Sequence, residues 1–232
     1  MFYDKSNKII RIKIFIALKN LENNYKMLNF LKKCIEVGRI SIERKNKYII
    51  WYIESKKDIY KIINILDKYP LLTSRKICQL EFLKKYLENR DLEKYLNEKD
   101  FKFDKQNSII NYYNNNFIIP DYFKGWLSGF IEAEGNFSVV KYKTGFIKKR
   151  QFNIGQNLDE YLIKAIKVYL NSNHKICSKQ EKNSIFLHYR ISIGGSIANN
   201  NLINHFKLYP LLGNKLKSYD IWLKSFNITN FK

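Results

Sequence analysis

Apolar and polar residues alternate in two separate parts of the chain. In residues 9–16, I-I-R-I-K-I-F-I, the cations Arg11 and Lys13 alternate with isoleucines, a pattern typical of a strand with one apolar and one basic face. The alternation predicts strand structure over residues 10–18. A second segment of the same kind, residues 137–154, predicts further strands in the other half of the chain.

The same series of elements is predicted after each alternating segment. Apolar residues recur at helical spacing, then alternate in a hairpin with a polar turn, and then return to helical spacing twice. In the first half these elements are a helix over residues 24–36, a hairpin over 39–54 with its turn at 44–47, and helices over 57–68 and 75–88. In the second half they are a helix over residues 159–171, a hairpin over 175–193 with its turn at 180–183, and helices over 196–208 and 216–226.

Three short matches indicate that the two halves are copies of one unit. In chain order they join residues 20–22 to 157–159 at an offset of 137, residues 51–53 to 189–191 at an offset of 138, and Y-P-L-L at 69–72 to the same letters at 209–212 at an offset of 140. Each match is weak alone, but their common order and similar offset favour a duplication.

The duplication predicts an α+β fold with two pseudo-repeated units, each with an antiparallel sheet. We expect the first unit over residues 1–88 and the second over 121–232. Residues 89–120 are charged and then rich in Asn, and we expect them to form a linker along the surface, with a helix near residues 92–98.

Charge and composition indicate the class of partner. The chain carries 42 Lys and Arg against 21 Asp and Glu, a formal charge of +21, which favours a nucleic acid as the neutralising polyanion. A membrane surface is the rival, but no apolar run approaches the roughly 18 residues of a membrane span. Lys, Ile, Asn, Tyr and Phe, all with A/T-rich codons, dominate the sequence, so we expect a protein encoded in an organelle and located in the mitochondrion or another organelle.

Cationic, amide and aromatic side chains are interleaved on the predicted strands and turns, as on sheets whose cations contact phosphates and whose amides and arginines contact base edges. In the first copy, the predicted nucleic-acid-binding residues are Arg11, Lys13, Arg44, Lys45, Lys47 and Trp51. In the second copy, they are Lys141, Lys143, Lys148, Lys149, Arg150, Gln151, Asn153, Lys179, Lys182, Tyr189 and Arg190.

The cysteines and histidines do not form a recognisable site. Cys34, Cys78 and Cys177 are far apart and include no C-x-x-C pair, so we expect reduced cysteines in the core rather than disulfides or a zinc site. The three histidines show no metal-ligand spacing and are expected to be structural.

Residues 127–135, L-S-G-F-I-E-A-E-G, resemble the nine-residue motif of the LAGLIDADG homing endonucleases. They match it at Leu, Gly, Ile, Ala and the final Gly, with Glu132 and Glu134 in place of both aspartates. The duplicated architecture from about Lys8 to about Phe226 is also similar to the single-chain, two-repeat members. The resemblance implies two αββαββα units with saddle-like antiparallel sheets. It also implies two motif helices that pack closely through small residues, here Ser128, Gly129 and Ala133.

In this family each motif helix ends in an acid, and the two acids together bind the divalent metal that hydrolyses DNA. By resemblance, Glu134 is the catalytic and metal-binding acid for Mg²⁺, and Glu132 is the motif's other, usually structural acid. The repeat offset places the first copy's motif before Met1. We therefore expect a truncated first unit and a degenerate active site in which Glu134 is vestigial, because Asp4, the nearest acid, lacks any L-x-G-x-I context.

A motif helix without its partner helix would leave apolar side chains uncovered. We expect Trp126, Leu127, Phe130 and Ile131 to form such a patch, covered by another polypeptide, a second copy of the chain or an RNA surface.

Three functions fit these expectations. The favoured one is a cleavage-deficient nucleic-acid-binding protein derived from a homing endonuclease and bound to structured RNA. That RNA would be organellar ribosomal RNA, within the ribosome, or group I intron RNA, as for the maturases of the family. The alternative is an active, metal-dependent DNA endonuclease whose first motif is supplied by another chain. The third is a non-catalytic DNA-binding regulator.

Overall fold

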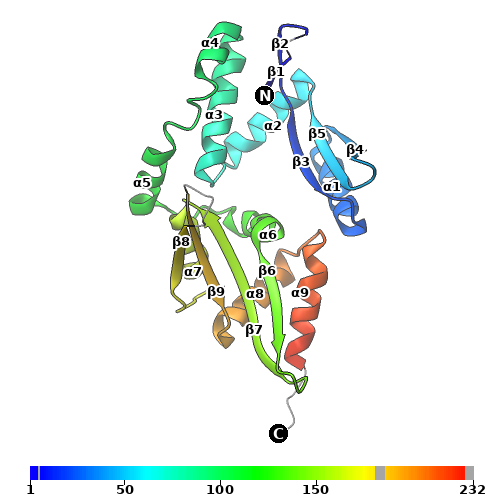
Figure 1. The fold of residues 1–232 in the computed structure, drawn as a ribbon, viewed down its shortest axis with the longest axis vertical. Helices are drawn as coiled ribbons and strands as arrows, with labels where there is room; N and C mark the ends of the chain where they lie inside the picture. Colours follow the sequence, from blue (N-terminus) through cyan, green and yellow to red (C-terminus); the bar gives the residue numbers. More distant parts are fainter. Residues whose placement is uncertain (5, 181–185, 228–232) are drawn as a thin grey trace. The chain divides into compact units, whose positions relative to one another are not determined.

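The computed structural model describes residues 1–4, 6–180 and 186–227. It divides by internal contacts into two units, Met1–Tyr112 and Tyr113–Lys232, and the boundary lies inside the segment predicted as a linker. Each unit combines helices with antiparallel sheet, as the alternating pattern predicts, and the series of elements is similar in both (Figure 1). The α+β class and the two repeated halves are therefore confirmed.

Unit 1 contains a short hairpin, a three-stranded sheet and helices. The hairpin pairs β1 (Phe2–Asp4) with β2 (Ile9–Arg11). The sheet has the order β3-β5-β4, from β3 (Ile14–Lys19), β4 (Arg39–Glu43) and β5 (Tyr48–Ile53). The helices are α1 (Glu22–Ile35), α2 (Lys56–Lys68), α3 (Ser74–Asn89) and α4 (Leu92–Glu98), and α5 (Gln106–Asn116) runs across the unit boundary.

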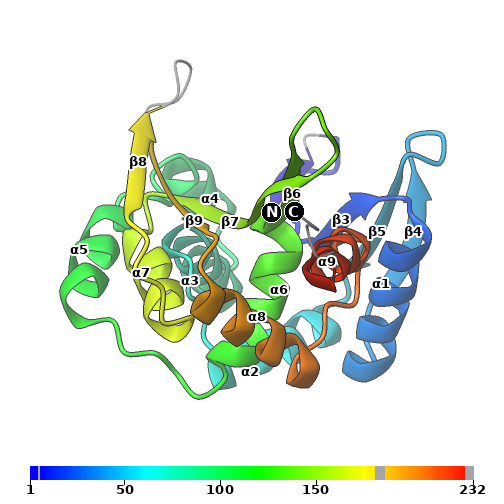
Figure 2. The ribbon, with the colours of Figure 1, turned by 90° about the horizontal axis from the view of Figure 1, so that it is seen from below.

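Unit 2 has a four-stranded sheet of order β6-β7-β9-β8, with its helices on one side of it (Figure 2). The strands are β6 (Asn136–Lys141), β7 (Ile147–Asn157), β8 (Ile176–Gln180) and β9 (Leu187–Ile193). The helices are α6 (Phe123–Glu134), α7 (Glu160–Tyr169), α8 (Ser196–Leu208) and α9 (Lys215–Lys224), followed by a 3₁₀ turn at Ser225–Asn227.

The strand registers superimpose one unit on the other. In unit 1, β3 pairs with β5 from Ile14↔Ile53 to Lys19↔Tyr48, and in unit 2, β7 pairs with β9 from Phe152↔Ile193 to Asn157↔His188. The offset is therefore 138 residues along β3 and 140 along β5. The sequence matches at 20–22 and 51–53 were shifted, by one and two residues, because matches of only three residues fit several registers. The Y-P-L-L match at 140 agrees with β5.

Each unit has its own buried core. In unit 1, Leu28 and Ile49 are fully buried, and the indole of Trp51 is 4% exposed and donates a hydrogen bond to the Val37 carbonyl at 3.0 Å. In unit 2, Phe152 and Trp222 are fully buried. These side chains lie on the alternate strand positions and helix faces that the apolar pattern marked.

Two predicted elements differ from the structure. The strand predicted over residues 10–18 is split into β2 and β3. The β2 strand pairs with β1 as far as Arg11, and β3 pairs with β5 from Ile14 onward, so the two residues between them lack a ladder partner. In unit 2, β6 and β9 both pair with β7 at residues 152–153, and that strand is continuous. The linker prediction found α4 but missed α5, whose Asn-rich sequence has low intrinsic helix propensity.

The cysteine prediction is wrong for two of the three residues. Cys78 is buried, whereas Cys34 and Cys177 are exposed, because Cys34 lies on the outer side of α1 and Cys177 on the open face of its sheet. Along the part of the chain that the structure describes, no helix has the length and apolarity required to span a membrane.

Candidate nucleic-acid interface and motif helix

The motif residues form the second half of α6, and Gly135 ends this helix. The Gly135 N–H donates to the Ile131 carbonyl at 2.8 Å, and the backbone then turns to an extended conformation that leads directly into β6. A Cβ atom at residue 135 would lie 2.7 Å from the Ile131 carbonyl oxygen. Only glycine fits this abrupt helix-to-strand junction.

The apolar side chains of α6 are already buried. Leu127 and Ile131 are fully buried and Phe130 is 9% exposed, while the Trp126 ring stacks on Phe123 at 5.4 Å and on Phe130 at 4.7 Å. The expected uncovered patch is therefore wrong for Leu127, Phe130 and Ile131, and Trp126 is half-buried. These residues form the core-facing side of the helix. An apolar side that faces a partner would have the same spacing in the sequence.

The exposed side of α6 consists of small residues. Gly125, Gly129 and Ala133 follow one another at intervals of four residues and are all exposed, and a Cβ atom at either glycine would meet no atom within 4 Å. Such a stripe lets another backbone approach closely. Ser128, which the sequence grouped with Gly129 and Ala133, instead turns inward.

The Ser128 hydroxyl belongs to a chain of hydrogen bonds around a buried histidine. It donates to the Tyr209 carbonyl at 2.7 Å and lies 2.9 Å from Nε2 of His205, whose Nδ1 lies 3.0 Å from the Tyr169 hydroxyl. A neutral imidazole protonated at Nε2 satisfies every member of this chain. Burial, with the nearby charge of Lys124, lowers the pKa of His205 to about 4, so this tautomer persists at neutral pH.

The two motif acids have different environments. Glu132 accepts hydrogen bonds from the backbone N–H groups of Gly213 at 3.2 Å and Lys215 at 2.9 Å, and so holds its carboxylate at the N-terminus of α9. A negative charge there is favourable to the helix. Glu134 is exposed, and no hydrogen bond or ion pair joins its carboxylate to the described residues. Glu132 is thus held by the backbone at the start of α9, whereas the metal-binding role that the resemblance implies for Glu134 stays a prediction.

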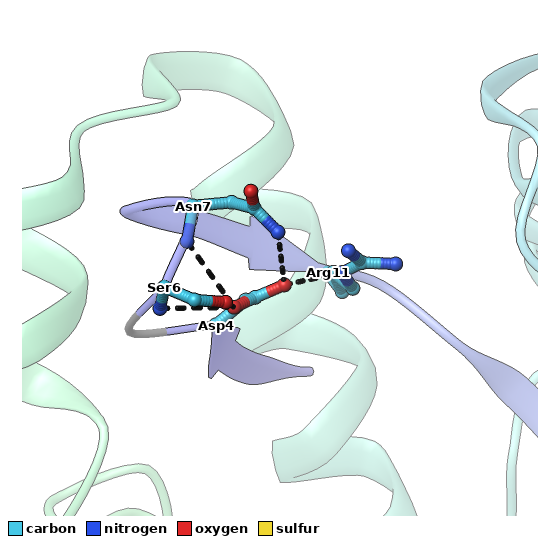
Figure 3. A network of polar contacts seen from close by, with 4 residues as sticks. All are labelled: Asp4, Ser6, Asn7 and Arg11. Atoms are coloured by element: carbon cyan, nitrogen blue, oxygen red, sulfur yellow. Dashed lines mark hydrogen bonds and ion pairs between the residues drawn. The ribbon is translucent and has the colours of Figure 1, made fainter.

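Asp4, the nearest acid before the first repeat's sheet, is committed to its own turn. Its carboxylate accepts from Ser6 Oγ at 2.6 Å, Asn7 Nδ2 at 2.9 Å and Arg11 Nε at 2.8 Å (Figure 3). Hydrogen bonds from Ser6 and then Asn7, with a smaller contribution from Arg11, lower the pKa of this carboxyl far below its usual range. These contacts fix the hairpin between β1 and β2.

A metal ion has one clear candidate ligand in this region, Glu134. A carboxylate oxygen suits Mg²⁺. Among the described residues, however, no group of three or more His, Cys, Asp or Glu side chains lies together as a metal would require. The carboxylates of Glu132 and Asp4 are bound by other groups, so neither is available as a second acid beside Glu134.

The open face of the unit 2 sheet, opposite the helices, carries hydrogen-bonding side chains in cross-strand rows. We call this surface the unit-2 face, and define it by Gln151, Asn153, Asn157, Cys177, Lys179, His188, Arg190 and Ser192. The Arg190 guanidinium donates through Nη2 to Asn153 Oδ1 at 3.1 Å and to Ser192 Oγ at 3.3 Å. His188 Nδ1 lies 2.8 Å from Asn157 Oδ1. These contacts orient both side chains along the face.

The equivalent surface in unit 1 has a different chemistry. We call it the unit-1 face, and define it by Lys13, Phe15, Ala17, Lys19, Arg39, Ser41, Glu43, Tyr48, Ile50 and Tyr52. The Lys13 ammonium lies 4.2 Å from the centroid of the Tyr52 ring, and Phe15 is 57% exposed. Aromatic and aliphatic side chains thus occupy rows that are polar in unit 2.

The structure divides the predicted nucleic-acid-binding residues into groups. Gln151, Asn153, Lys179, Arg190 and Lys13 lie on the two faces. The exposed cations Arg44, Lys45, Lys47, Lys141, Lys143, Lys148 and Lys149 lie on or next to the hairpin turns at the rim, Arg11 pairs with Asp4, and Lys182 lies outside the described residues.

Three of the predicted residues are directed away from the open faces. The indole of Trp51 lies in the core of unit 1, and the Arg150 guanidinium donates to the Ser225 carbonyl at 2.6 Å. Tyr189 lies two residues before the buried Ile191, and therefore on the same, helix-covered side of β9. The sequence prediction passed over His188, Asn157 and Ser192, although strict period-2 counting from Arg190 and Asn153 would have found them.

Comparisons with known proteins relate the whole chain to one family. The family model described as "LAGLIDADG endonuclease" matches residues 3–86 and 127–226, which are the two repeats. A "Probable intron-encoded endonuclease aI3" of Debaryomyces hansenii is 34% identical over 248 residues, covering 94% of this chain but 34% of the relative. A protein of the same name from Dictyostelium citrinum is 35% identical over 219 residues, covering 92% of this chain and 84% of the relative. The chain thus spans about a third of the first relative's length and most of the second's.

Among solved structures, the LAGLIDADG homing endonuclease I-GzeII in complex with its DNA target has a TM-score of 0.71 and 21% identity. The match covers 92% of this chain and 79% of that chain. At this identity the likeness concerns the fold.

Proposed function

Because this chain belongs to the LAGLIDADG endonuclease family, we propose that it binds duplex DNA through the unit-1 face and the unit-2 face. The observation that carries the proposal is Arg190, which two hydrogen bonds hold in place on an open sheet face. Within the described part of the chain, Nη1 and Nε make no further hydrogen bond and are available for a ligand. An arginine presented in this way is the commonest partner of guanine O6 and N7 in the major groove.

The remaining charge suits the phosphate backbone. The lysines of the hairpin turns extend beyond the ends of each sheet, and the formal charge of +21 favours a polyanion. The related proteins are named as intron-encoded endonucleases, and I-GzeII was crystallised on a DNA target, which supports DNA as the partner. The intron-encoded names also support the proposal that the protein is encoded and acts in an organelle.

We propose further that this polypeptide alone cleaves DNA poorly. Glu134 is the available motif carboxylate, whereas Glu132 is bound to the N-terminus of α9 and Asp4 to its own turn. A bound Mg²⁺ would supply activation of water and stabilisation of the leaving oxygen. Glu134 would hold it only together with a second acid from outside the described residues, delivered along the Gly125–Gly129–Ala133 stripe. An active endonuclease completed by another chain is therefore the catalytic form of the same proposal.

Structured RNA, the partner favoured by the sequence analysis, is the second candidate. It has one specific observation in its favour, the exposed Phe15 ring beside Tyr52 on the unit-1 face. Aromatic side chains on an open sheet stack on unpaired RNA bases. Ribosomal RNA and group I intron RNA both contain such bases.

A DNA-binding regulator without chemistry would use the same faces as the endonuclease and would differ only in the absence of cleavage.

Competition binding tests these candidates. We expect duplex DNA selected from a random library to bind more tightly than group I intron RNA at equal salt, and Arg190→Gln to weaken specific binding roughly 5- to 150-fold, the value of one bidentate base contact. Arg90→Gln removes the same charge from an exposed position outside both faces and serves as the control. Tighter binding to the RNA, or equal effects of the two substitutions, would overturn the DNA proposal.

Cleavage is tested separately on the selected duplex with Mg²⁺. We expect no cleavage by the purified chain. Efficient double-strand cleavage by this polypeptide, abolished by Glu134→Gln, would overturn the cleavage-deficient proposal while leaving the binding proposal intact.

A further inference from the structure

The centres of the two faces carry different side chains at equivalent positions. In unit 2 the central row is Gly155–Arg190–Cys177, and in unit 1 the equivalent row is Ala17–Ile50–Ser41. The arginine of one face is therefore replaced by an isoleucine in the other.

In the row next to the central one, polar residues of unit 2 are likewise replaced by aromatic residues in unit 1. Asn153 and Ser192, the residues that orient Arg190, correspond to Phe15 and Tyr52 in unit 1. Neither the central isoleucine nor the ring of Phe15 can donate or accept a hydrogen bond.

The apolar surface of the unit-1 face is accessible. Phe15 is 57% exposed and Ala17 is exposed, while Ile50, the cross-strand neighbour of Ala17 on the same face, is 9% exposed. Exposed apolar groups on one face of an open sheet are expected to meet another apolar group in a complex.

Cations flank this apolar centre on both sides. Lys19 lies at the end of β3, Lys13 precedes β3 with its ammonium over the Tyr52 ring, and Arg39 lies on the opposite edge strand β4. Glu43, on β4, is the acid of this face, so its margins carry three cations and one carboxylate. An apolar centre with a net positive margin complements a DNA groove whose floor offers an apolar group and whose walls are phosphates.

We infer that the unit-1 face recognises the 5-methyl groups of thymine in the major groove, through the exposed Phe15 and Ala17 and the neighbouring Ile50. The inference rests on the proposed binding of duplex DNA. Thymine is the base that presents a methyl group in the major groove, and Ala and Phe are among the side chains that contact it. A single target would then be read in two ways, with thymines under unit 1 and a guanine at Arg190 of unit 2.

The experiment replaces thymine by deoxyuridine, which removes the methyl group and keeps every hydrogen-bonding group of the base. A duplex selected from a random library by the full chain is resynthesised with deoxyuridine in one half or in the other. In the half bound by unit 1, we expect affinity to fall by about fourfold for each methyl group contacted, the effect of leaving one buried CH₂ unburied. In the other half we expect no change.

Variants assign the sensitive half to unit 1. In the double variant Phe15→Ser and Ala17→Ser, the difference between thymine and deoxyuridine duplexes should disappear. Phe101→Ser, at an equally exposed phenylalanine outside the face, should retain it. Arg190→Gln should also retain it while losing preference for guanine. Because Phe15 and Ala17 are exposed, these serines are compatible with folding.

The outcomes separate the inference from the function it rests on. Equal affinity for thymine and deoxyuridine duplexes, equal losses in both halves, or a loss that persists in the double variant would overturn methyl recognition and leave DNA binding in place. Failure to select any duplex would overturn both. Preferential binding of single-stranded RNA, lost in the double variant, would instead assign the face to base stacking.

Discussion

The sheets of the two units share a register but differ in how their equivalent positions are covered. On the helix side, Ile14 and Ile16 of β3 correspond to Phe152 and Ile154 of β7. Ile16 is 39% exposed, whereas Ile154 is 1% exposed. In unit 2, α6 packs on β7 and α9 on β6, while β3 is the edge strand of its sheet. The same ladder therefore supports a closed core in one unit and a half-open one in the other.

The open sides differ in both chemistry and burial, because Phe15 is 57% exposed where Asn153 is 8% exposed, and Ile50 is 9% exposed where Arg190 is exposed. Arg190 and Asn153 of unit 2 stand where unit 1 has Ile50 and Phe15. A duplicated fold keeps the backbone ladder, because it is set by hydrogen bonds common to all residues, and frees the outward side chains to diverge. Four changes test this comparison.

Truncation of equivalent core residues should give the largest effect. Phe152→Ala should destabilise unit 2 by about 3–5 kcal/mol, because a fully buried ring leaves a cavity. Ile14→Ala, at the equivalent half-buried position, should cost only about 1–2 kcal/mol. Urea unfolding followed by tryptophan fluorescence measures both, since Trp51 reports on unit 1 and Trp126 and Trp222 on unit 2. Equal losses would contradict the difference in closure.

Acidification should destabilise unit 2 selectively. The pKa of His205 is lowered in the folded state to about 4 from 6.5, so between these values the unfolded chain binds a proton that the folded chain does not. Stability should therefore fall by roughly 2–3 kcal/mol as pH drops from 6.5 to 4. Its counterpart in unit 1, Ile65, cannot titrate. The slope of stability against pH should flatten in His205→Gln, and an unchanged slope would show that another group is responsible.

Gly155 and Ala17 occupy equivalent positions in the central rows, and exchanging them should lower stability moderately for Gly155→Ala and only slightly for Ala17→Gly. A Cβ atom at Gly155 would lie 2.5 Å from His188 Nε2 and 2.8 Å from the Tyr189 carbonyl oxygen. Gly155→Ala should therefore cost about 1–2 kcal/mol and move His188 from its place on the face. Ala17→Gly, at the equivalent position, should cost less than about 1 kcal/mol. Thermal unfolding compares them, and a stabilised Gly155→Ala would be the contrary result.

The motif acids should give the smallest effects on stability. Glu132→Ala removes the acceptor for two N–H groups at the start of α9 and should cost about 1 kcal/mol, given partial exposure. Glu134→Ala touches no partner among the described residues and should change stability by less than about 0.5 kcal/mol. Thermal melts of the two single variants would contradict this assignment if Glu134→Ala were the more costly.

Much of the fold follows from the sequence, but the exposure of α6 does not. Helices such as α8 and the hairpin turn at residues 44–47 were predicted from the sequence pattern, since local pattern and tertiary environment agree there, whereas most of the turn predicted at 180–183 lies outside the described residues. The apolar residues of α6 were interpreted as partner-facing, yet they face the core. Helical spacing states that residues share a face and is silent on what covers it.

The sequence by itself determined the duplication, the common series of strands and helices in the two repeats, and the position of the motif acids Glu132 and Glu134. These properties depend on local periodicity and on short motifs, which involve residues close together in the sequence and can be recognised without knowing how the chain folds. Only the tertiary structure decided that Glu132 binds the start of α9 and that Trp51 and Arg150 point inward. It also decided which residue of unit 1 is equivalent to Arg190 in the sheet. Register across a sheet joins residues distant in sequence, and a shift of one position reverses every side chain.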